Sequence, residues 1–277
     1  MKLTSILTGY FKTDGGGMYG VIPKIMWQKI TPADQNNYIR VAMRSLLINT
    51  GDRIILIDTG AGENHSEKMQ KIYGFHGEEN LKSSLNKAGY QLTDITDVII
   101  THLHYDHSGG LFDQQNKPVL PNATIHIGQK QWENANNPNP REKAAFDKEI
   151  LNNIKAYPKV NFIKEEGYLF DNIYIKIFNG HTKGLVVPVI THGSKKIVFA
   201  SDLIPTAAHV YEPYIASFDM CAEKVLEEKV SLYKEILQYD HCVFFEHDIR
   251  NECGKVTDTE KGHKTSELYT LTEFLER

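Results

Sequence analysis

The stretch Thr101-His102-Leu103-His104-Tyr105-Asp106-His107-Ser108-Gly109-Gly110 is the most informative part of this chain. It places three imidazoles and one carboxylate within six residues, directly after the apolar segment 97–100. Such groups are costly to hold together unless a cation lies among them, and neutral imidazoles with a carboxylate suit zinc and related divalent ions. Two histidines separated by one residue can converge on one ion, while the aspartate and histidine that follow point toward a second. The glycine pair predicts a backbone bend that helps to place these side chains.

The bulk composition agrees with a soluble enzyme and excludes little else. The chain has 277 residues and a formal net charge of −4, with acidic and basic residues interspersed, so no basic stripe favours nucleic-acid binding. No segment approaches the run of about 20 apolar residues that spans a bilayer, and residues 1–7 are too short and mixed for the core of a signal peptide. The three cysteines form no CxxC pair, which indicates free thiols and a cytoplasmic protein.

Apolar runs and turn residues predict alternating strands and helices in one α/β domain. Strands are expected at 41–49, 53–58, 97–101, 124–128, 160–163, 173–178, 186–191, 197–201 and 241–246. Helices are expected at 78–88, 141–155, 222–239 and 266–275. In the longest helix the predicted buried stripe consists of Val225, Leu226, Val230, Tyr233, Ile236 and Leu237. No linker or repeat divides the chain.

Three further candidate ligands each follow a predicted strand. They are His181 within Asn179-Gly180-His181-Thr182, Asp202 after 197–201, and His247 after 241–246. The loops at strand ends are where α/β scaffolds usually place functional groups. Together with the cluster at 102–107, these positions predict a metal site assembled from distant parts of the sequence.

With these residues in view, the chain resembles the metallo-β-lactamase superfamily, whose HxHxDH signature appears as His102, His104, Asp106 and His107. His181, Asp202 and His247 match the remaining ligand positions in order and spacing, and Ile57-Asp58-Thr59-Gly60 fits an early element of the family. The resemblance covers nearly the whole chain. It implies a single domain over 1–277 with a four-layer αββα sandwich fold.

The same resemblance implies a site for two metal ions. One ion would be held by His102, His104 and His181. The other would be held by Asp106, His107 and His247, with Asp202 bridging both. Zinc is the expected metal, while manganese, iron or cobalt also suit these ligands. Asp106 and Asp202 are the expected catalytic carboxylates, since either can carry the proton when a bridging hydroxide attacks. Asp58 is either a carboxylate that orients a histidine ligand or a turn cap, and Glu246 either a similar partner or a solvated neighbour.

Weaker features indicate the branch of the superfamily. Residues 14–27 look like the N-terminal segment of the N-acyl-homoserine-lactone lactonases related to methyl parathion hydrolase, and 202–209 and 246–248 also fit that branch. The resemblance implies a quorum-quenching lactonase, with phosphotriester hydrolysis as the main alternative. Segment 14–27 would be a flap that contacts substrate, a homodimer contact, or a loop packed on its own domain. The substrate contacts it would supply, together with one from the loop after Asp202, are Met18, Tyr19, Ile22, Met26, Trp27 and His209.

Some residues depart from the expected pattern. Asn179 and Lys183 flank the Gly-His-Thr motif where the family often has proline, and Leu185 stands where histidine or glutamine is frequent. Small lactonases have a tyrosine three residues after the bridging aspartate, and Pro205 stands there in this chain. The oxyanion would then rest mainly on metal, assisted by Tyr19 or His209.

Other superfamily activities fit less well. Asp202 argues against a true β-lactamase, and the short segment after His247 argues against a thioester hydrolase of the glyoxalase II type. Missing basic segments argue against RNA processing, and the second set of ligands argues against a single-iron dioxygenase. A non-enzymatic scaffold or binding protein would not need an intact set of metal ligands, so the presence of this set argues against that class.

Overall fold

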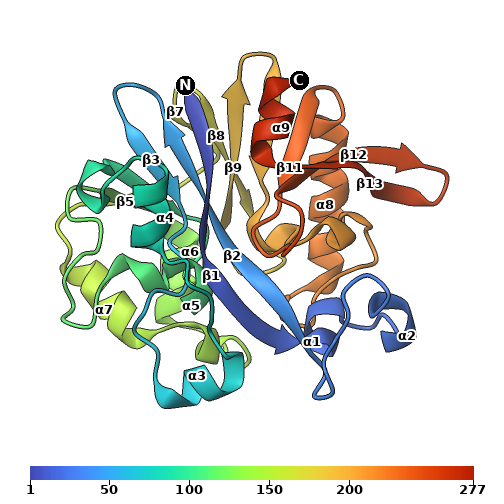
Figure 1. Cartoon of the computed structure of the whole chain (residues 1–277), viewed down its shortest axis with the longest axis horizontal. Helices are drawn as coiled ribbons and strands as arrows, with labels where there is room; N and C mark the ends of the chain where they lie inside the picture. The colour runs from blue at the N-terminus through green and yellow to red at the C-terminus, as the bar shows by residue number, and fades with distance from the viewer. The chain divides into compact units, whose positions relative to one another are not determined.

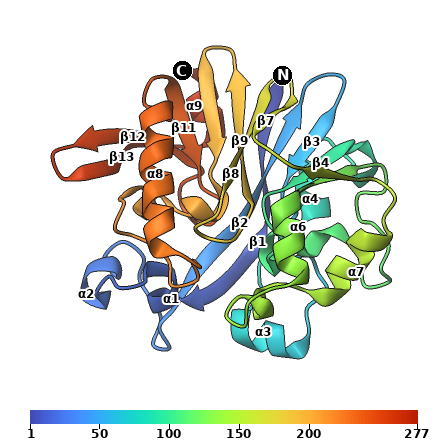
Figure 2. The same cartoon turned by 180° about the vertical axis from the view of Figure 1, so that it is seen from behind.

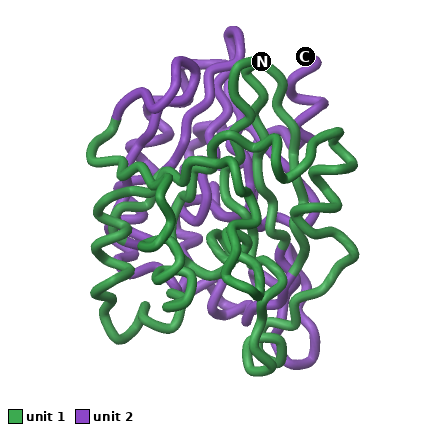
Figure 3. Tube along the Cα trace, turned by 90° about the vertical axis from the view of Figure 1, so that its left-hand side faces the viewer, with its two compact units in different colours: residues 1–10, 42–166, 183–186 green, residues 11–41, 167–182, 187–277 purple.

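The computed structural model describes residues 1–277, which fall into two compact units (Figure 3). Unit 1 consists of Met1–Tyr10, Ala42–Glu166 and Lys183–Val186. Unit 2 consists of Phe11–Val41, Gly167–Thr182 and Val187–Arg277. Each unit is therefore built from segments that are far apart in the sequence, and the predicted single domain over 1–277 stays a prediction.

The first sheet is mixed and has the strand order β1-β2-β3-β4-β5-β6 (Figure 1). Its strands are β1 Lys2–Asp14, β2 Tyr38–Asn49, β3 Ile54–Ile57, β4 Asp97–Ile100, β5 Thr124–Gly128 and β6 Val160–Ile163. β2 and β3 pair antiparallel, whereas β3, β4, β5 and β6 run parallel to one another. The continuous apolar runs of β3 and β4 are buried, as expected for parallel strands covered on both faces.

Unit 1 contains the helices α3 Glu67–Tyr73, α4 Leu81–Lys87, α5 Tyr105–Ser108, α6 Gln129–Asn136 and α7 Lys148–Ala156, with short 3₁₀ helices at Leu92–Asp94, Gly109–Leu111 and Lys143–Ala145. Of these, α4 and α7 pack against the parallel part of the sheet. Leu85 of α4 and Ile154 of α7 belong to one buried cluster with Val98 of β4 and Ile125 of β5. This packing fixes the carboxyl end of β4, from which the histidine-rich stretch emerges.

The second sheet belongs to unit 2 except for the first two residues of β9, and it has the order β13-β12-β11-β10-β9-β8-β7. Its strands are β7 Gly167–Phe170, β8 Ile173–Phe178, β9 Leu185–His192, β10 Lys195–Phe199, β11 Asp240–Phe244, β12 Cys253–Thr259 and β13 Gly262–Tyr269. β10 and β11 are parallel, and the other pairs for which register is defined are antiparallel. A parallel pair needs a crossover, which here contains α8 Ala222–Ile236.

Besides α8, unit 2 contains α1 Gly15–Tyr19, α2 Lys24–Trp27, α9 Leu271–Glu276 and 3₁₀ helices at Ser201–Leu203 and Ala207–Val210. Figure 2 shows α8 running along one face of the second sheet. Its buried face includes Val225, Leu232, Tyr233 and Ile236, but also the charged residues Glu228 and Lys229. No helix in the structure is long and apolar enough to cross a membrane.

All nine expected strands are present, and their ends differ from the expected ends by at most three residues. The helix expected at 266–275 is wrong over its first half, because residues 262–269 form β13 and α9 begins only at Leu271. A hairpin turn with Gly262 at φ +99° pairs β13 with β12, and Thr270 and Glu273 form a capping box at the start of α9. Pairing between distant residues therefore overrides the local helical pattern.

Two of the other expected helices also need correction. The helix expected at 141–155 is split, since Asp147 caps α7 and separates it from the 3₁₀ turn before it. Leu226 of α8 and Leu237, which follows its last residue, are 39% and 37% exposed rather than part of the buried stripe. The helix is turned so that Glu228 and Lys229 face inward, where both bind backbone groups.

Candidate metal centre

Unit 1 brings together the four residues of the histidine-rich stretch. The potential ligand atoms of His102 and His104 lie within 4.8 Å of each other, as do those of Asp106 and His107. The ring centroids of His102 and His107 are 3.9 Å apart. His102 and His107 are fully buried, and His104 and Asp106 are nearly so. Because β4 ends immediately before this stretch, a short loop and one turn of α5 suffice to gather all four side chains.

Asp58 ties this stretch to the end of β3. Its carboxylate accepts hydrogen bonds from the Thr101 backbone N–H at 2.7 Å and the Thr101 hydroxyl at 2.6 Å, and it lies 3.1 Å from His107 Nδ1. Asp58 is completely buried and has φ +57°, a costly conformation for a residue other than glycine. Such strain persists only where the surroundings impose it, which here are the contacts to Thr101 and His107.

The remaining ring nitrogens of unit 1 have polar neighbours too. His102 Nδ1 is 3.1 Å from the Thr101 hydroxyl, and His104 Nε2 is 3.2 Å from Glu142 Oε1. Glu142 is 3% exposed and also accepts from Asn134 Nδ2 at 3.0 Å. A buried carboxylate in this position orients the His104 ring, and sequence analysis gave it no role, since it fell inside the helix expected at 141–155.

The glycine pair has a different role from the one expected. Gly109 has φ −62°, so no left-handed bend is present there. Instead, a Cβ at Gly109 would lie 2.3 Å from the Ala61 carbonyl oxygen, and one at Gly110 would lie 2.4 Å from that of Thr59. The pair is needed because two backbone segments pack directly against each other, which brings Asp58 next to the histidines.

Unit 2 gathers the other three predicted ligands, with Asp202 between the two histidines. Asp202 Oδ2 is 3.2 Å from His181 Nε2, and Asp202 Oδ1 is 3.0 Å from His247 Nε2. His181 follows β8, Asp202 follows β10, and His247 follows β11. Ser201 directly precedes Asp202 in the sequence and has φ +47°, so its backbone is strained in the same way as that of Asp58. One carboxylate thus lies between two imidazoles that come from different strand ends.

Two acidic residues that sequence analysis missed hold the His181 loop. Asp219 Oδ1 is 2.7 Å from His181 Nδ1, and both side chains are buried. Glu228 of α8 accepts from the backbone N–H groups of Asn179 at 2.8 Å and Gly180 at 3.0 Å. A Cβ at Gly180 would lie 2.5 Å from the Val225 backbone nitrogen, so only glycine allows this approach to α8. No local pattern marks these two residues. The partner of Asp219 is 38 residues away, and the partners of Glu228 are 48 and 49 residues away.

The donor set fits divalent metal ions. The Thr101 hydroxyl gives its single proton to Asp58, so His102 Nδ1 must be the donor toward it, and Nε2 is then the lone-pair nitrogen. In the other three histidines one ring nitrogen faces a carboxylate, which can only accept, so that nitrogen carries the proton. The lone-pair nitrogen is then Nε2 in His107 and His181, and Nδ1 in His104. Metal-ligating histidines characteristically hold their other N–H on a carboxylate or a comparable acceptor. Neutral imidazoles and carboxylates are the ligands that zinc prefers.

Segment 14–27 lies in unit 2 and is packed there through some of its side chains. The Tyr19 ring stacks between Trp27 and His209, at 5.2 Å from each, and its hydroxyl is 2.6 Å from Thr31 Oγ1. Met18, Tyr19 and Trp27 are buried, whereas Met26 is 51% exposed. Burial lowers the pKa of His209 to about 3, so its imidazole is neutral, and its Nε2 lies 2.9 Å from the Met18 carbonyl oxygen.

A cavity of about 860 Å³ in unit 2 has both Tyr19 and His247 in its lining. Burial raises the pKa of the Tyr19 hydroxyl, which therefore stays protonated at neutral pH. Met18, Ile22, Met26, Trp27 and His209 are not among the lining residues. Their direct contact with a substrate stays a prediction.

These clusters of histidine and aspartate on an α/β scaffold define the protein as a metal-dependent hydrolase, and comparison with known proteins agrees. Residues 44–228 match the family model of the metallo-beta-lactamase superfamily. An N-acyl homoserine lactonase of Bacillus cereus is 26% identical over 232 residues, covering 79% of this chain and 86% of that protein.

Solved structures extend this similarity over nearly the whole chain. A probable metal-dependent hydrolase from Staphylococcus aureus superposes with a TM-score of 0.88 at 26% identity, covering 96% of this chain and 95% of that one. The dizinc quorum-quenching lactonase AidC, solved in complex with a product, gives a TM-score of 0.80 at 26% identity and covers 97% of this chain and 95% of that one.

The chain belongs to the metallo-β-lactamase superfamily and has its fold, with two mixed sheets plus helices. The expected fold class and the resemblance on which it rested are confirmed.

Proposed function

We propose that this protein is a lactonase that opens lactone rings, with N-acyl-homoserine lactones as the first candidates, using two divalent metal ions. His102, His104 and His181 would hold one ion. Asp106, His107 and His247 would hold the other, with Asp202 shared between them. The observation that supports this most is the Asp202 carboxylate, whose two oxygens lie 3.2 and 3.0 Å from the imidazoles of His181 and His247.

Two divalent ions so held would supply Lewis acidity and a hydroxide nucleophile at neutral pH. The chain's own residues keep the ligands in position. Asp58, Glu142 and Asp219 each face the histidine nitrogen that is not proposed to bind metal. They fix the tautomer and the ring orientation and make the ligand nitrogen more basic.

In the reaction, water adds to the lactone carbonyl carbon and the ring C–O bond breaks. The products are a carboxylate and an alcohol, and the alcohol oxygen needs a proton. We assign to Asp106 or Asp202 the transfer of that proton from water to the leaving oxygen, since both are carboxylates among the proposed ligands. Pro205 offers no hydroxyl to the oxyanion, and its carbonyl oxygen instead accepts from the His247 backbone N–H at 3.0 Å.

The choice of lactones over other substrates rests on the relatives. The curated relatives of Bacillus are named N-acyl homoserine lactonases, and AidC is named a lactonase, all at about 26% identity or less. A substrate panel at equal concentration of metal-loaded enzyme tests this choice. It would include acyl-homoserine lactones, simple lactones, a phosphotriester, a β-lactam and a glutathione thioester.

The proposal predicts the highest kcat/KM for a lactone. A phosphotriester, β-lactam or thioester that exceeded every lactone by tenfold or more would contradict it. A protein inactivated at Asp202 is the control, since it must lose whichever activity the panel reveals.

We also propose a cytoplasmic homodimer that forms through segment 14–27. Val21 is 93% exposed, Ile25 68% and Met26 51%, so this segment presents apolar side chains to solvent. Light scattering at micromolar concentration tests the dimer, and a monomeric mass would contradict it.

A further inference from the structure

The cavity in unit 2 has a strongly cationic wall. Its volume of about 860 Å³ lies within the range typical of small-molecule sites. Five basic side chains line it, from β1, β2, β13 and two loops: Lys12, Lys29, Arg40, Arg250 and Lys264. The chain as a whole has a net charge of −4, so this concentration of positive charge is local.

The two carboxylates in the lining are already engaged with backbone groups. Asp34 Oδ1 accepts from the N–H groups of Asn36 and Tyr38 at 2.9 and 3.0 Å. Asp248 accepts from the N–H groups of Arg250 and Asn251, each at 2.9 Å, and from that of Ala207 at 3.1 Å. These aspartates shape the loops, and the lining retains an excess of basic over acidic side chains.

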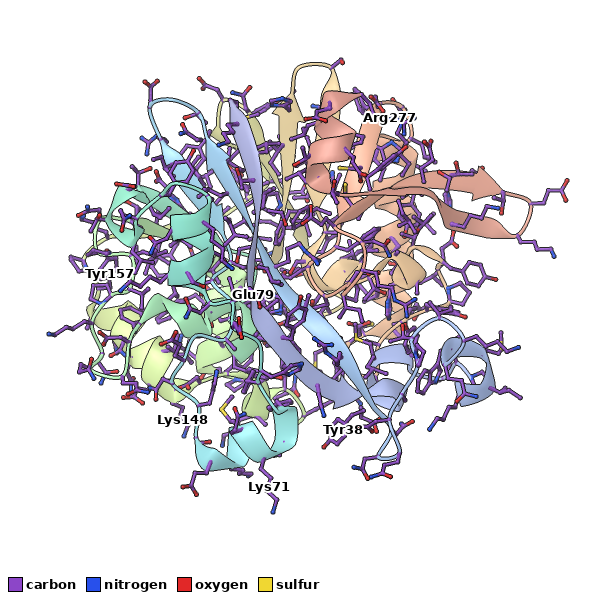
Figure 4. The ribbon with its side chains drawn as sticks, viewed as in Figure 1. Tyr38, Lys71, Glu79, Lys148, Tyr157 and Arg277 are labelled. Atoms are coloured by element: carbon purple, nitrogen blue, oxygen red, sulfur yellow. The ribbon has the colours of Figure 1, made fainter.

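The rest of the lining can hold a carbon skeleton. Tyr38, labelled in Figure 4 at the start of β2, contributes a ring, as do Tyr19, Tyr211 and Tyr214. Ile39 and Val41 add apolar surface from the same strand. His247, a proposed metal ligand, lines the same cavity. A molecule in the cavity would therefore reach a proposed metal ligand and the cationic side chains at once.

We propose that the preferred substrate is an anionic lactone or ester, with a carboxylate or phosphate on the part that remains in this cavity. The inference rests on the proposed lactonase function and specifies its substrate class. Like charges gathered in one concavity repel each other, and an anion relieves that repulsion and is drawn in by the same field. A purely apolar acyl chain would gain nothing from the ammonium and guanidinium groups and would remove water from them.

The first test compares matched substrates on the metal-loaded enzyme. Three γ-lactones would share one side arm that ends in a methyl, a carboxylate or a phosphate. We expect kcat/KM to be at least about tenfold higher for an anionic lactone at low salt, with the advantage shrinking as ionic strength screens the charges. The better of the carboxylate and phosphate arms identifies the anion. Equal or better cleavage of the methyl lactone at low salt would overturn the proposal.

The second test removes the charges. The triple variant Lys12→Gln/Arg40→Gln/Lys264→Gln should lose most of the preference for the anionic lactone, and the loss for that substrate should exceed the loss for the methyl lactone. An equal loss for both substrates would contradict charge recognition, because general damage to the site affects both alike.

A matched control removes three charges from unit 2 outside the cavity. Lys24, Lys224 and Lys261 are exposed and absent from the lining, and Lys261 lies in the same hairpin region as Lys264. The variant Lys24→Gln/Lys224→Gln/Lys261→Gln has the same net charge as the cavity variant. It should keep the preference. A loss of the same size in this control would show that net charge, not the cavity, is responsible.

Binding measured by calorimetry separates this inference from the lactonase proposal. Adipate should bind the wild-type protein at least about tenfold more tightly than hexanoate, and the cavity variant should lose this difference. If no lactone is cleaved but this difference is found, the lactonase proposal fails and the anionic cavity stands. If lactones are cleaved but adipate and hexanoate bind alike, the inference fails and the lactonase proposal stands.

Discussion

The candidate metal ligands and the cationic cavity use side chains in opposite ways. Among the candidate ligands, His102, His104, His107 and His181 are buried, and each has one ring nitrogen fixed by a hydroxyl or carboxylate. In the cavity, Lys29, Arg40, Arg250 and Lys264 are exposed. Rigid, oriented ligands suit chemistry that needs a fixed geometry, whereas long exposed cations suit recognition of a charge. We therefore expect changes in the first region to abolish turnover and changes in the second to alter substrate preference.

The largest effect should come from Asp202→Ala. It removes the carboxylate that lies between His181 and His247, so turnover should fall by about a thousandfold or more. Steady-state kinetics measure the loss, and circular dichroism checks that the variant is folded. Rates within tenfold of wild type in a folded variant would remove Asp202 from the mechanism.

Metal removal should have a comparable effect without any change in sequence. Treatment with a chelator should abolish activity and lower the thermal midpoint of unfolding, because ions that bind only the folded chain stabilise it. Adding zinc back should restore both. Full activity in a preparation shown by elemental analysis to be free of metal would contradict metal dependence.

An intermediate effect is expected for the carboxylates that orient ligands. Asp219→Asn should weaken metal binding by about 10- to 100-fold, because a neutral amide holds the His181 ring less firmly. Competition with a chromogenic chelator measures the affinity. Asp258→Asn is the control, since Asp258 is exposed. Equal affinities in Asp219→Asn and wild type would leave Asp219 with a packing role only.

The smallest effect concerns Lys229, buried in α8. Its ammonium donates to the carbonyl oxygens of His209 at 2.8 Å and Tyr214 at 2.6 Å, and burial lowers its pKa from 10.5 to about 8. Between these two values the unfolded chain binds more protons than the folded chain, so this group's contribution to stability rises with pH. Relative to Lys229→Met, the free energy of unfolding of wild type should rise with pH between pH 8 and 10.5, most steeply in the middle of this window, where the slope approaches about 1.4 kcal/mol per pH unit.

Chemical denaturation of both proteins across that pH window measures the difference. A difference that stayed constant from pH 8 to 10.5 would contradict the lowered pKa.

What could be predicted from the sequence depends on whether the residues that act together are close in the sequence or follow a clear apolar run. The cluster at 102–107 is local, and the strands that end before His181, Asp202 and His247 have clear apolar runs, so the candidate ligands and most of the sheet could be predicted. Asp219 and Glu142 could not, because each finds its histidine partner 38 residues away with no periodic pattern. The β12–β13 hairpin was missed because residues 262–269 become a strand only by pairing with 253–259.

The cavity could not be predicted from the sequence at all. Its basic residues are separated along the chain and look like ordinary solvated charges, and only folding places them around one space. The packing of Tyr19 between Trp27 and His209 likewise depends on rings from distant segments. Side chains whose partners are remote in sequence leave no local signal.

The most direct test of the account is the metal content of the purified protein, measured by elemental analysis together with activity. We predict about two divalent ions per chain at full activity, with activity falling as the second ion is lost. A stable form with a single ion and undiminished lactone hydrolysis would contradict the two-metal site.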